Sequence, residues 1–366
     1  MIYLDWAATA PLSETAKQAW LEATAVTGNA SATHAAGRAA RSVLEDAREQ
    51  IASVLGVDPP EVIVTSGGTE ADNLAVAGPA ARGRVLYSAI EHPAVREAAE
   101  LHAPTHAVIP VTADGVVDMT ALESMLDEDV SLVSVMAANN ETGIIQPLAE
   151  IAALVRERAP QARLHTDAVQ AVASLDIPKD YAMSISGHKL GAPVGVGALI
   201  AARDYPLVPL EGGGGQERRV RSGTLNVAGA AALAAALSEA VELRSEREAR
   251  LRALGVRVAA ACVRAGGSLS GGDVPRLAHI VHALFPATDP EALLLGLDMA
   301  GIACSTGSAC SAGVYRPSRV LEAMGVDEAS TPLRFSLGEG TTEADVDALE
   351  RALPAAVDMA RRAVRA

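Results

Sequence analysis

The sequence predicts an α/β fold, in which a large domain with a mostly parallel sheet is joined to a smaller α+β domain. Two observations predict it. Short apolar runs alternate with helical runs across 61–200, which is typical of a parallel sheet covered by helices on both faces. A long alanine-rich stretch, 226–263, then indicates a connecting helix. We expect the large domain to span 13–245 and the small domain to combine 1–12 with 246–366.

Caps and breaks set the bounds of the first elements. Residues 1–4 form a short apolar run, and Ser13 caps a helix that ends near Val26. An amphipathic helix over 36–55 ends at Gly56. Up to residue 200 we further expect strands at 61–65, 85–88, 106–110, 132–136, 163–166, 183–185 and 196–200, one helix that begins at Thr69, one that ends near Leu101, and one over 148–158.

The C-terminal part mixes both kinds of element. Its patterns predict strands at 280–285 and 333–337, helices at 290–300, 318–324 and 343–364, and a loop from Cys304 to Gly313. A polar loop rich in glycine and arginine, 211–223, precedes the connecting helix. The sequence contains no internal repeat.

Composition excludes several classes of protein. The chain has 366 residues, and its net charge of −15 argues against a nucleic-acid partner, which would require a basic face. No apolar run reaches the roughly 18–20 residues of a membrane span, so we expect no membrane partner. The N-terminus has no basic segment, so we expect no signal peptide. The three cysteines, an odd count, favour reduced thiols and a cytoplasmic location.

Polar or reactive side chains follow five of the expected strands. Because ligands bind at the carboxyl ends of the strands in such sheets, we expect these side chains to form one site. The five residues are Thr69, His92, Asn140, Asp167 and Lys189.

Lys189 is the strongest candidate among them. It is one of only three lysines in a chain that otherwise uses arginine. Lysine can lose its proton and form a Schiff base, whereas arginine stays charged. The alternative is an ordinary surface lysine, but the neighbouring Ser186, His188 and glycines favour a Schiff-base role for Lys189. Ser186 and His188 are themselves candidates to donate hydrogen bonds to a phosphate.

An anion site and an acid complete a cofactor pocket. Gly67 and Gly68 lead from a strand into a helix at Thr69, which presents backbone N–H groups to an anion, although such a unit is often only a tight turn. Asp167 suits a protonated pyridine nitrogen, with a turn or cap aspartate as the alternative. With the lysine, these features predict pyridoxal 5'-phosphate (PLP) and no metal. His92 is placed to cover the ring or move a proton, although a lone histidine is usually structural.

Two residues of the C-terminal part are further candidates. Cys310 stands in a loop of small residues, which suits a mobile nucleophile better than a core thiol, with a plain loop cysteine as the alternative. Arg334 alternates with apolar residues on a strand, where its guanidinium suits a substrate carboxylate. A salt-bridged arginine is the equal alternative.

The series of motifs resembles the cysteine desulfurases, within the class V aminotransferase superfamily of PLP-dependent transferases of fold type I. The resemblance covers nearly the whole chain and is specific, because the motifs occur in the family's order. They are Tyr3-Leu4-Asp5, Ala7-Ala8-Thr9, Gly28-Asn29, 65–73, Glu91-His92, 139–143, Asp167-Ala168-Val169-Gln170, 186–189, 221–224, 307–310 and 333–336.

The resemblance implies a role for each candidate residue. The catalytic residues are Lys189 as the Schiff-base lysine, Cys310 as the nucleophile that forms a persulfide, and His92, which stacks on the ring and serves in acid–base steps. Asn140 and Arg334 bind substrate, Arg334 through the cysteine carboxylate. The cofactor is bound by Thr69, His92, Asn140, Asp167, Gln170, Ser186, His188 and Lys189, and by Thr224, which is expected to reach the phosphate of the other subunit in a homodimer.

The implied reaction converts L-cysteine to L-alanine. Lys189 removes the α-proton and the Cys310 thiolate takes the sulfur, which then passes to an acceptor protein such as an iron–sulfur scaffold or a tRNA-thiolation factor. The loop around Cys310 must move for this, because the sulfur meets a buried substrate and then an outside partner. The spacing from Cys310 to Arg334 resembles the IscS/NifS type.

Two alternatives stay open, and a few positions depart from the family. Another class V enzyme, such as a selenocysteine lyase or an aminotransferase, is the first alternative, although an aminotransferase needs no thiol. A catalytically idle scaffold is the second, but Lys189 and Cys310 are both present. Trp6, Ala10 and Ala30 are unusual residues and are expected near the opening of the site. We expect Cys304 to be a bystander rather than a second sulfur relay.

Overall fold

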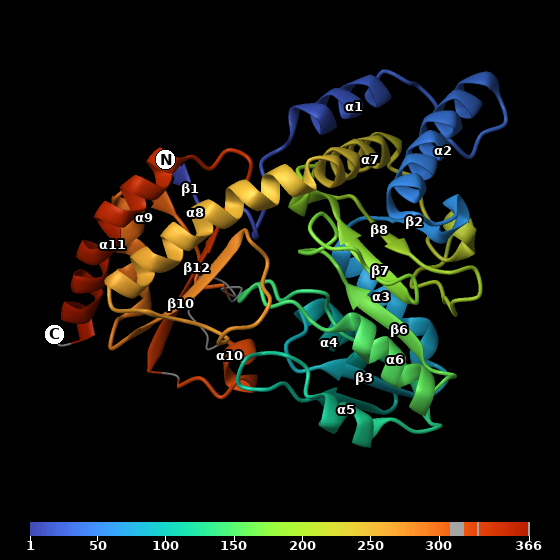
Figure 1. The fold of residues 1–366 in the computed structure, drawn as a ribbon. Coiled ribbons are helices and arrows are strands. Elements are labelled where there is room, and N and C mark those ends of the chain that lie inside the picture. Colours follow the sequence, from blue (N-terminus) through green and yellow to red (C-terminus); the bar gives the residue numbers. More distant parts are fainter. Residues whose placement is uncertain (308–317, 328, 365–366) are drawn as a thin grey trace.

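The structure is a computed structural model that describes residues 1–307, 318–327 and 329–364. Figure 1 shows two bodies, one around a large sheet and one around the C-terminal strands, with helix α8 alongside the second. No helix in the described ranges combines the length and the apolar character needed to cross a membrane.

The large body is built on a seven-stranded sheet. Six strands run parallel and only β8 runs against its neighbours, so the expected mostly parallel sheet is confirmed. Across the sheet the order is β2 (Val62–Thr65), β8 (Gly197–Ile200), β7 (Tyr181–Ser186), β6 (Arg163–Asp167), β5 (Val130–Ser134), β3 (Arg84–Ser88) and β4 (His106–Ile109).

Helices cover both faces of this sheet, because side chains alternate along its strands. In β2, Ile63 packs with Leu74 of helix α3, whereas Val62 and Val64 belong to the opposite and larger apolar cluster with Leu44 of helix α2. Nearly every residue of the alanine-rich α3 is buried. The helices of this body are α1 (Glu14–Thr24), α2 (Ala35–Leu55), α3 (Gly68–Ala80), α4 (Pro93–His102), α5 (Met119–Met125), α6 (Leu148–Arg158) and α7 (Val227–Glu242), with the short turns η1 (Pro59–Glu61), η2 (Gly187–Lys189) and η3 (Glu217–Arg219).

The expected single helix over 226–263 is wrong, since the structure contains two helices there. Helix α7 ends at Glu242, and α8 (Arg244–Arg264) begins after Leu243. The two helices serve different cores: α7 packs on α1 and α2, whereas α8 packs on the C-terminal strands and α11. The Arg244 guanidinium also donates to carbonyl oxygens of the segment 172–175, which fixes the chain at the break.

The second body has its own apolar cluster, which contains Leu4 from the N-terminal segment as well as Phe285 and Phe335. Strand β1 (Ile2–Tyr3) pairs with β11 (Ile302–Ala303), and a separate sheet has the order β12 (Ser330–Ser336), β10 (Ile280–Pro286) and β9 (Ser268–Leu269). Its helices are α8, α9 (Pro290–Met299) and α11 (Glu343–Val364), whereas the short α10 (Arg319–Ala323) packs with Ile90, Met136 and Ile144 of the large body. The N-terminal segment therefore joins both bodies, since Ala7 belongs to the larger cluster.

Candidate active site

The carboxyl ends of five parallel strands form one edge of the large sheet. Thr69 follows β2, His92 follows β3, Asn140 follows β5, Asp167 ends β6 and Lys189 follows β7. The parallel pairings along β3, β5, β6 and β7 bring their ends together directly, while β8 separates β7 from β2. The last strand residues, the loops and the helix starts at this edge supply these five side chains.

Asp167 is a buried carboxylate with few partners. Its Oδ1 accepts a hydrogen bond of 2.9 Å from the Val169 N–H, which is its only hydrogen-bond donor among the described residues. Burial raises the pKa of Asp167, while the Val169 N–H and the positive charges of His92 and Lys189 oppose that shift. A cationic N–H beside this carboxylate would therefore be strongly stabilised.

His92 caps helix α4. Its Nδ1 accepts from the Ala94 N–H at 3.2 Å, so the proton of the neutral ring lies on Nε2. Burial lowers the pKa of His92, the Asp167 carboxylate opposes this, and Lys189 adds to it. The expectation of a chemical role and the alternative of a structural histidine are thus compatible, because one ring nitrogen caps the helix and the other is left for a ligand.

Lys189 is held by the N-terminal segment. Its Nζ donates to the carbonyl oxygens of Ala7 and Ala8 at 2.6 and 2.7 Å, and Gln170 donates to the same Ala7 oxygen at 2.9 Å. Burial lowers the pKa of Lys189 to about 8, with a further contribution from the Arg334 guanidinium. An appreciable fraction of this amine is therefore neutral near neutral pH, which a Schiff-base lysine requires.

An anion cradle, made of Ser66 to Thr69 with Ser186, lies at the start of α3. A Cβ atom on Gly68 would lie 2.8 Å from Val169 Cγ2 and 3.5 Å from Ser186 Cβ, so only glycine leaves this space open. The side chain of Glu70 accepts the Ser66 N–H at 2.6 Å. Within the described part of the chain, the N–H groups of Gly68, Thr69 and Glu70 have no acceptor, as expected of a helix start that binds an anion.

His188 lies next to this cradle in sequence and is fixed from the N-terminal segment. Its Nδ1 lies 2.8 Å from the Thr9 hydroxyl oxygen. Burial and the Lys189 charge lower the pKa of His188 to about 4, so its ring is neutral at physiological pH. Thr224, the other expected phosphate ligand, is exposed on the loop before α7.

Arg334 connects the two bodies. Its guanidinium donates to Asp5 Oδ1 and to the Asn140 carbonyl oxygen, each at 2.8 Å. The salt-bridged arginine that we considered is therefore present, in the pair with Asp5. The Arg334 Nε is buried and has no partner within the ranges that the structure describes. A bound carboxylate beside this guanidinium would satisfy that donor.

Cys310 lies outside the described residues, but the chain on both sides of it is placed. The position that a Cβ of Gly307 would take is 3.3 Å from Glu141 Cβ, and the Ser318 hydroxyl donates to Glu141 Oε2 at 2.5 Å. Cys304 is described, and burial raises the pKa of its thiol to about 12. That thiol is protonated at physiological pH.

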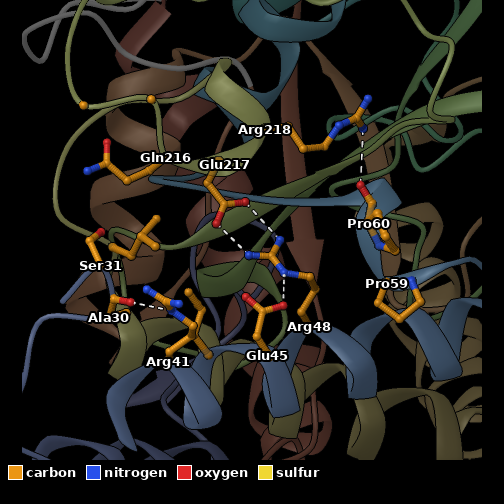
Figure 2. Close-up of a pocket in the computed structure, with 14 residues that line it drawn as sticks. Ala30, Ser31, Arg41, Glu45, Arg48, Pro59, Pro60, Gln216, Glu217 and Arg218 are labelled. Atoms are coloured by element: carbon orange, nitrogen blue, oxygen red, sulfur yellow. Dashed lines mark hydrogen bonds and ion pairs between the residues drawn. The ribbon is translucent and has the colours of Figure 1, made fainter. Parts of the chain in front are cut away.

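The three residues that depart from the family, Trp6, Ala10 and Ala30, line two different hollows of the structure. Trp6 and Ala10 line a cavity of about 400 Å³ that also borders Lys189 and Gln170. Ala30 instead lines a different hollow, shown in Figure 2, where its carbonyl oxygen accepts from Arg41.

Sequence reasoning missed a polar layer under the strand ends. His165 lies between the hydroxyl groups of Ser134 and Ser184, at 2.8 and 3.0 Å, and its Nε2 is 3.6 Å from Asp72 Oδ1. All of these side chains are buried. The signal was present, since polar residues interrupt otherwise apolar strands, but their mutual contact depends on sheet order.

The residues present fit PLP. Asp167 offers a carboxylate to a pyridine nitrogen, Lys189 offers an amine for an aldehyde, and the glycine cradle leaves room for a phosphate at a helix start. The described residues contain no cluster of three or more metal-ligating side chains. The site is thus built for an aldehyde-bearing anion with a basic ring nitrogen.

Comparisons with known proteins agree with this geometry. The family model "Aminotransferase class-V" matches residues 2–349. The whole chain is 47% identical to a Mycobacterium tuberculosis protein named IscS-like cysteine desulfurase, of which it covers 98%. A solved NifS-like protein from Rickettsia africae has a TM-score of 0.90 and 32% identity, with 98% of this chain and 99% of that chain covered. A structure described as SspA in complex with cysteine has a TM-score of 0.79 and 30% identity, with 92% and 99% covered.

Proposed function

This chain belongs to the class-V aminotransferase family and is a PLP-dependent cysteine desulfurase, and from that premise we propose how its own residues carry the reaction. The observation that supports the proposal best is that Asp167 ends β6 and Lys189 follows the neighbouring β7, with a glycine cradle at the same sheet edge. PLP supplies an electron sink that stabilises negative charge at the substrate Cα.

The large body holds the cofactor. Asp167 keeps a proton on the pyridine nitrogen, and burial makes that charge pair strong. The start of α3, with Thr69, Ser186 and His188, binds the phosphate. Lys189 would hold the cofactor through its aldehyde, and its amine, once free, would remove the α-proton of the substrate. His92 would cover the ring, and the proton of its neutral imidazole lies on Nε2, because Nδ1 caps α4.

The substrate carboxylate binds between the two bodies. Arg334 is the residue for it, since its guanidinium is fixed by Asp5 and by the Asn140 carbonyl while its Nε–H lacks a partner among the described residues. The side chain of Asn140 follows the same strand end as this carbonyl and contacts the substrate. Such fixing orients L-cysteine with its Cα over the lysine.

Cys310 takes the sulfur. Its thiolate attacks the sulfur of L-cysteine, so that an S–S bond forms while the substrate C–S bond breaks. The substrate Cβ keeps the electron pair and accepts a proton, and Cα regains the proton held by Lys189, which yields L-alanine and a Cys310 persulfide. Gly307, three residues before Cys310 in the sequence, supports the role, because a Cβ at this glycine would lie 3.3 Å from Glu141 Cβ, next to Asn140.

The persulfide sulfur then passes to an acceptor protein. We propose an iron–sulfur scaffold or a tRNA-thiolation factor as that partner, and the cytoplasm, where thiols stay reduced, as the location. We also propose a homodimer in which Thr224 reaches the phosphate bound by the other subunit. The proposed domains, 13–245 and 1–12 with 246–366, are supported by two separate apolar clusters.

Chemical trapping of the lysine tests the cofactor site. Reduction of the PLP-loaded enzyme with sodium borohydride fixes the cofactor to its lysine, and peptide mass spectrometry then locates it. The chain offers three lysines, so Lys17 and Lys179 serve as internal controls. We expect the adduct on Lys189 alone. An adduct on either control, or none on a protein that has bound PLP, would contradict the proposed site.

A further inference from the structure

Three consecutive residues near the anion cradle adopt left-handed backbone angles. They are Glu217, Arg218 and Arg219, with φ of 42°, 59° and 67°. Residues other than glycine disfavour the left-handed region, because their Cβ meets the backbone there. A run of three such residues therefore requires contacts that hold it in place. The run belongs to loop 211–224, which ends at Thr224. The contacts of Glu217 show what holds it.

Glu217 and Arg48 form a two-pronged ion pair, shown in Figure 2. Arg48 Nη2 lies 2.7 Å from Glu217 Oε1, and Nη1 lies 3.0 Å from Oε2. The side chain of Glu217 is only 1% exposed and that of Arg48 11%. Arg48 is also held by Glu45, at 3.1 Å from its Nε. A planar fork that meets a carboxylate in this way fixes orientation as well as distance.

The same pair closes the free edge of β2. Glu217 Oε2 accepts the Val64 N–H at 3.0 Å, and Arg48 donates to the Val62 carbonyl oxygen. Strand β2 pairs with β8 on its other side only. Strand β2 ends at Thr65, directly before Ser66 and the anion cradle. The ion pair therefore fixes the strand from which the cradle begins.

A second ion pair fixes the loop on the far side of the cradle. Arg221 Nε lies 3.0 Å from Glu70 Oε1, and Glu70 Oε2 accepts the Ser66 N–H. Within the loop, Gln216 Oε1 accepts from the Gly223 N–H at 3.2 Å. The loop is therefore tied to β2 through Glu217 and to the start of α3 through Arg221, and the cradle lies between these two points.

We propose that Arg48 and Glu217 are positioning residues for the PLP phosphate, although neither touches it. By holding the left-handed path of the loop, they place Arg221 on Glu70 and set where Thr224 projects. Loss of Arg48 leaves Glu217 buried without its counter-charge, and loss of the Glu217 charge leaves Arg48 with Glu45 alone, so in either case the loop departs from this path. The proposal rests on the proposed function, in that the cradle is taken to bind PLP.

The test compares two ligands of the apo-protein, PLP and pyridoxal, which lacks only the phosphate. In Arg48→Met and in Glu217→Gln we expect the dissociation constant of PLP to rise about tenfold to a hundredfold, the range for losing a charge-assisted contact. The pyridoxal constant stays within about twofold, because the lysine and Asp167 are untouched. Both constants are measured from the visible absorbance of the bound cofactor.

Glu217→Gln separates positioning from simple electrostatics. Removal of a negative charge should strengthen phosphate binding if only charge matters, whereas the proposal expects weaker binding. Arg84→Met is the matched control, since Arg84 also bonds a carboxylate and a main-chain carbonyl but lies at the opposite end of β3 from His92. We expect this control to bind both ligands as the wild type does.

The outcomes are distinct. Equal weakening of PLP and pyridoxal, or unchanged PLP affinity in Glu217→Gln, would overturn the positioning role. A wild-type protein that binds neither ligand would instead refute the proposed cofactor site. If Arg48→Met fails to fold, Arg48→Lys keeps the charge but loses the fork, and its PLP affinity must fall for the proposal to stand. Adding Thr224→Ala to Glu217→Gln should cause little further loss, because both act through one loop.

Discussion

At the strand ends, burial sets the proton affinity of each side chain before any ligand binds. It lowers the pKa of Lys189 and His92 and raises that of Asp167. The residue types and their places after strands could be predicted from the sequence, because apolar runs mark strands and the chemistry marks the residues. The pairing of Arg334 with Asp5 could not, since the N-terminal segment must first meet β12.

The Lys189 amine gives cofactor binding a defined pH dependence. Only the neutral amine attacks the aldehyde, so the rate of PLP binding to the apo-protein should rise with pH and level off above a midpoint near 8. Arg334→Met removes a positive charge that lowers this pKa, so the midpoint should move to higher pH. Stopped-flow absorbance at pH values from about 7 to 10 measures both. A rate independent of pH, or a midpoint moved downward by Arg334→Met, would argue against this account.

At the scale of elements, most helices and strands follow from periodicity and caps. The helix over 148–158 has the bounds that its pattern predicts, and α11 ends where expected. The break at Leu243 was missed because local propensity is helical throughout, and only packing on two cores separates α7 from α8. Helix α5 (Met119–Met125) was missed because seven residues carry too little periodic signal.

Arg219 tests the cost of the left-handed run. Its φ is 67°, it is exposed, and its side chain makes no hydrogen bond among the described residues. Arg219→Gly should therefore stabilise the protein by about 1 kcal/mol or less, since relief of backbone strain exceeds the added freedom of the unfolded chain. Thermal unfolding followed by circular dichroism measures the shift. Arg82→Gly, at an exposed site without positive φ, should destabilise, and the same sign in both variants would refute the argument.

At the scale of the whole molecule, the candidate site lies where the two bodies meet, each with its own apolar cluster. Arg334 comes from one body and Lys189 from the other, while the N-terminal segment contacts both through Asp5 and Ala7. The sequence predicts two bodies from its change of pattern at the connecting stretch. It does not predict how the bodies meet, because that depends on side chains far apart in the chain.

Mixed dimers test whether Thr224 serves the other subunit. Lys189→Ala and Thr224→Asp should each be inactive, the first without its lysine and the second through repulsion of the phosphate. If Thr224 acts across the interface, a mixed dimer contains one site with both residues intact. Unfolding and refolding the two variants together should then restore part of the activity, up to about one quarter of the wild-type value for random pairing. No recovery in verified mixed dimers would place Thr224 in its own subunit's site.

The central claim is that L-cysteine gives its sulfur to Cys310. L-alanine and sulfide formed from L-cysteine with a thiol reductant should be measured for the wild type, Cys310→Ala and Cys304→Ala, each with PLP bound. The account predicts turnover in the wild type and in Cys304→Ala, because the partly buried Cys304 thiol stays protonated with a pKa of about 12. It predicts loss of both products in Cys310→Ala. Equal turnover in Cys310→Ala and the wild type would contradict it.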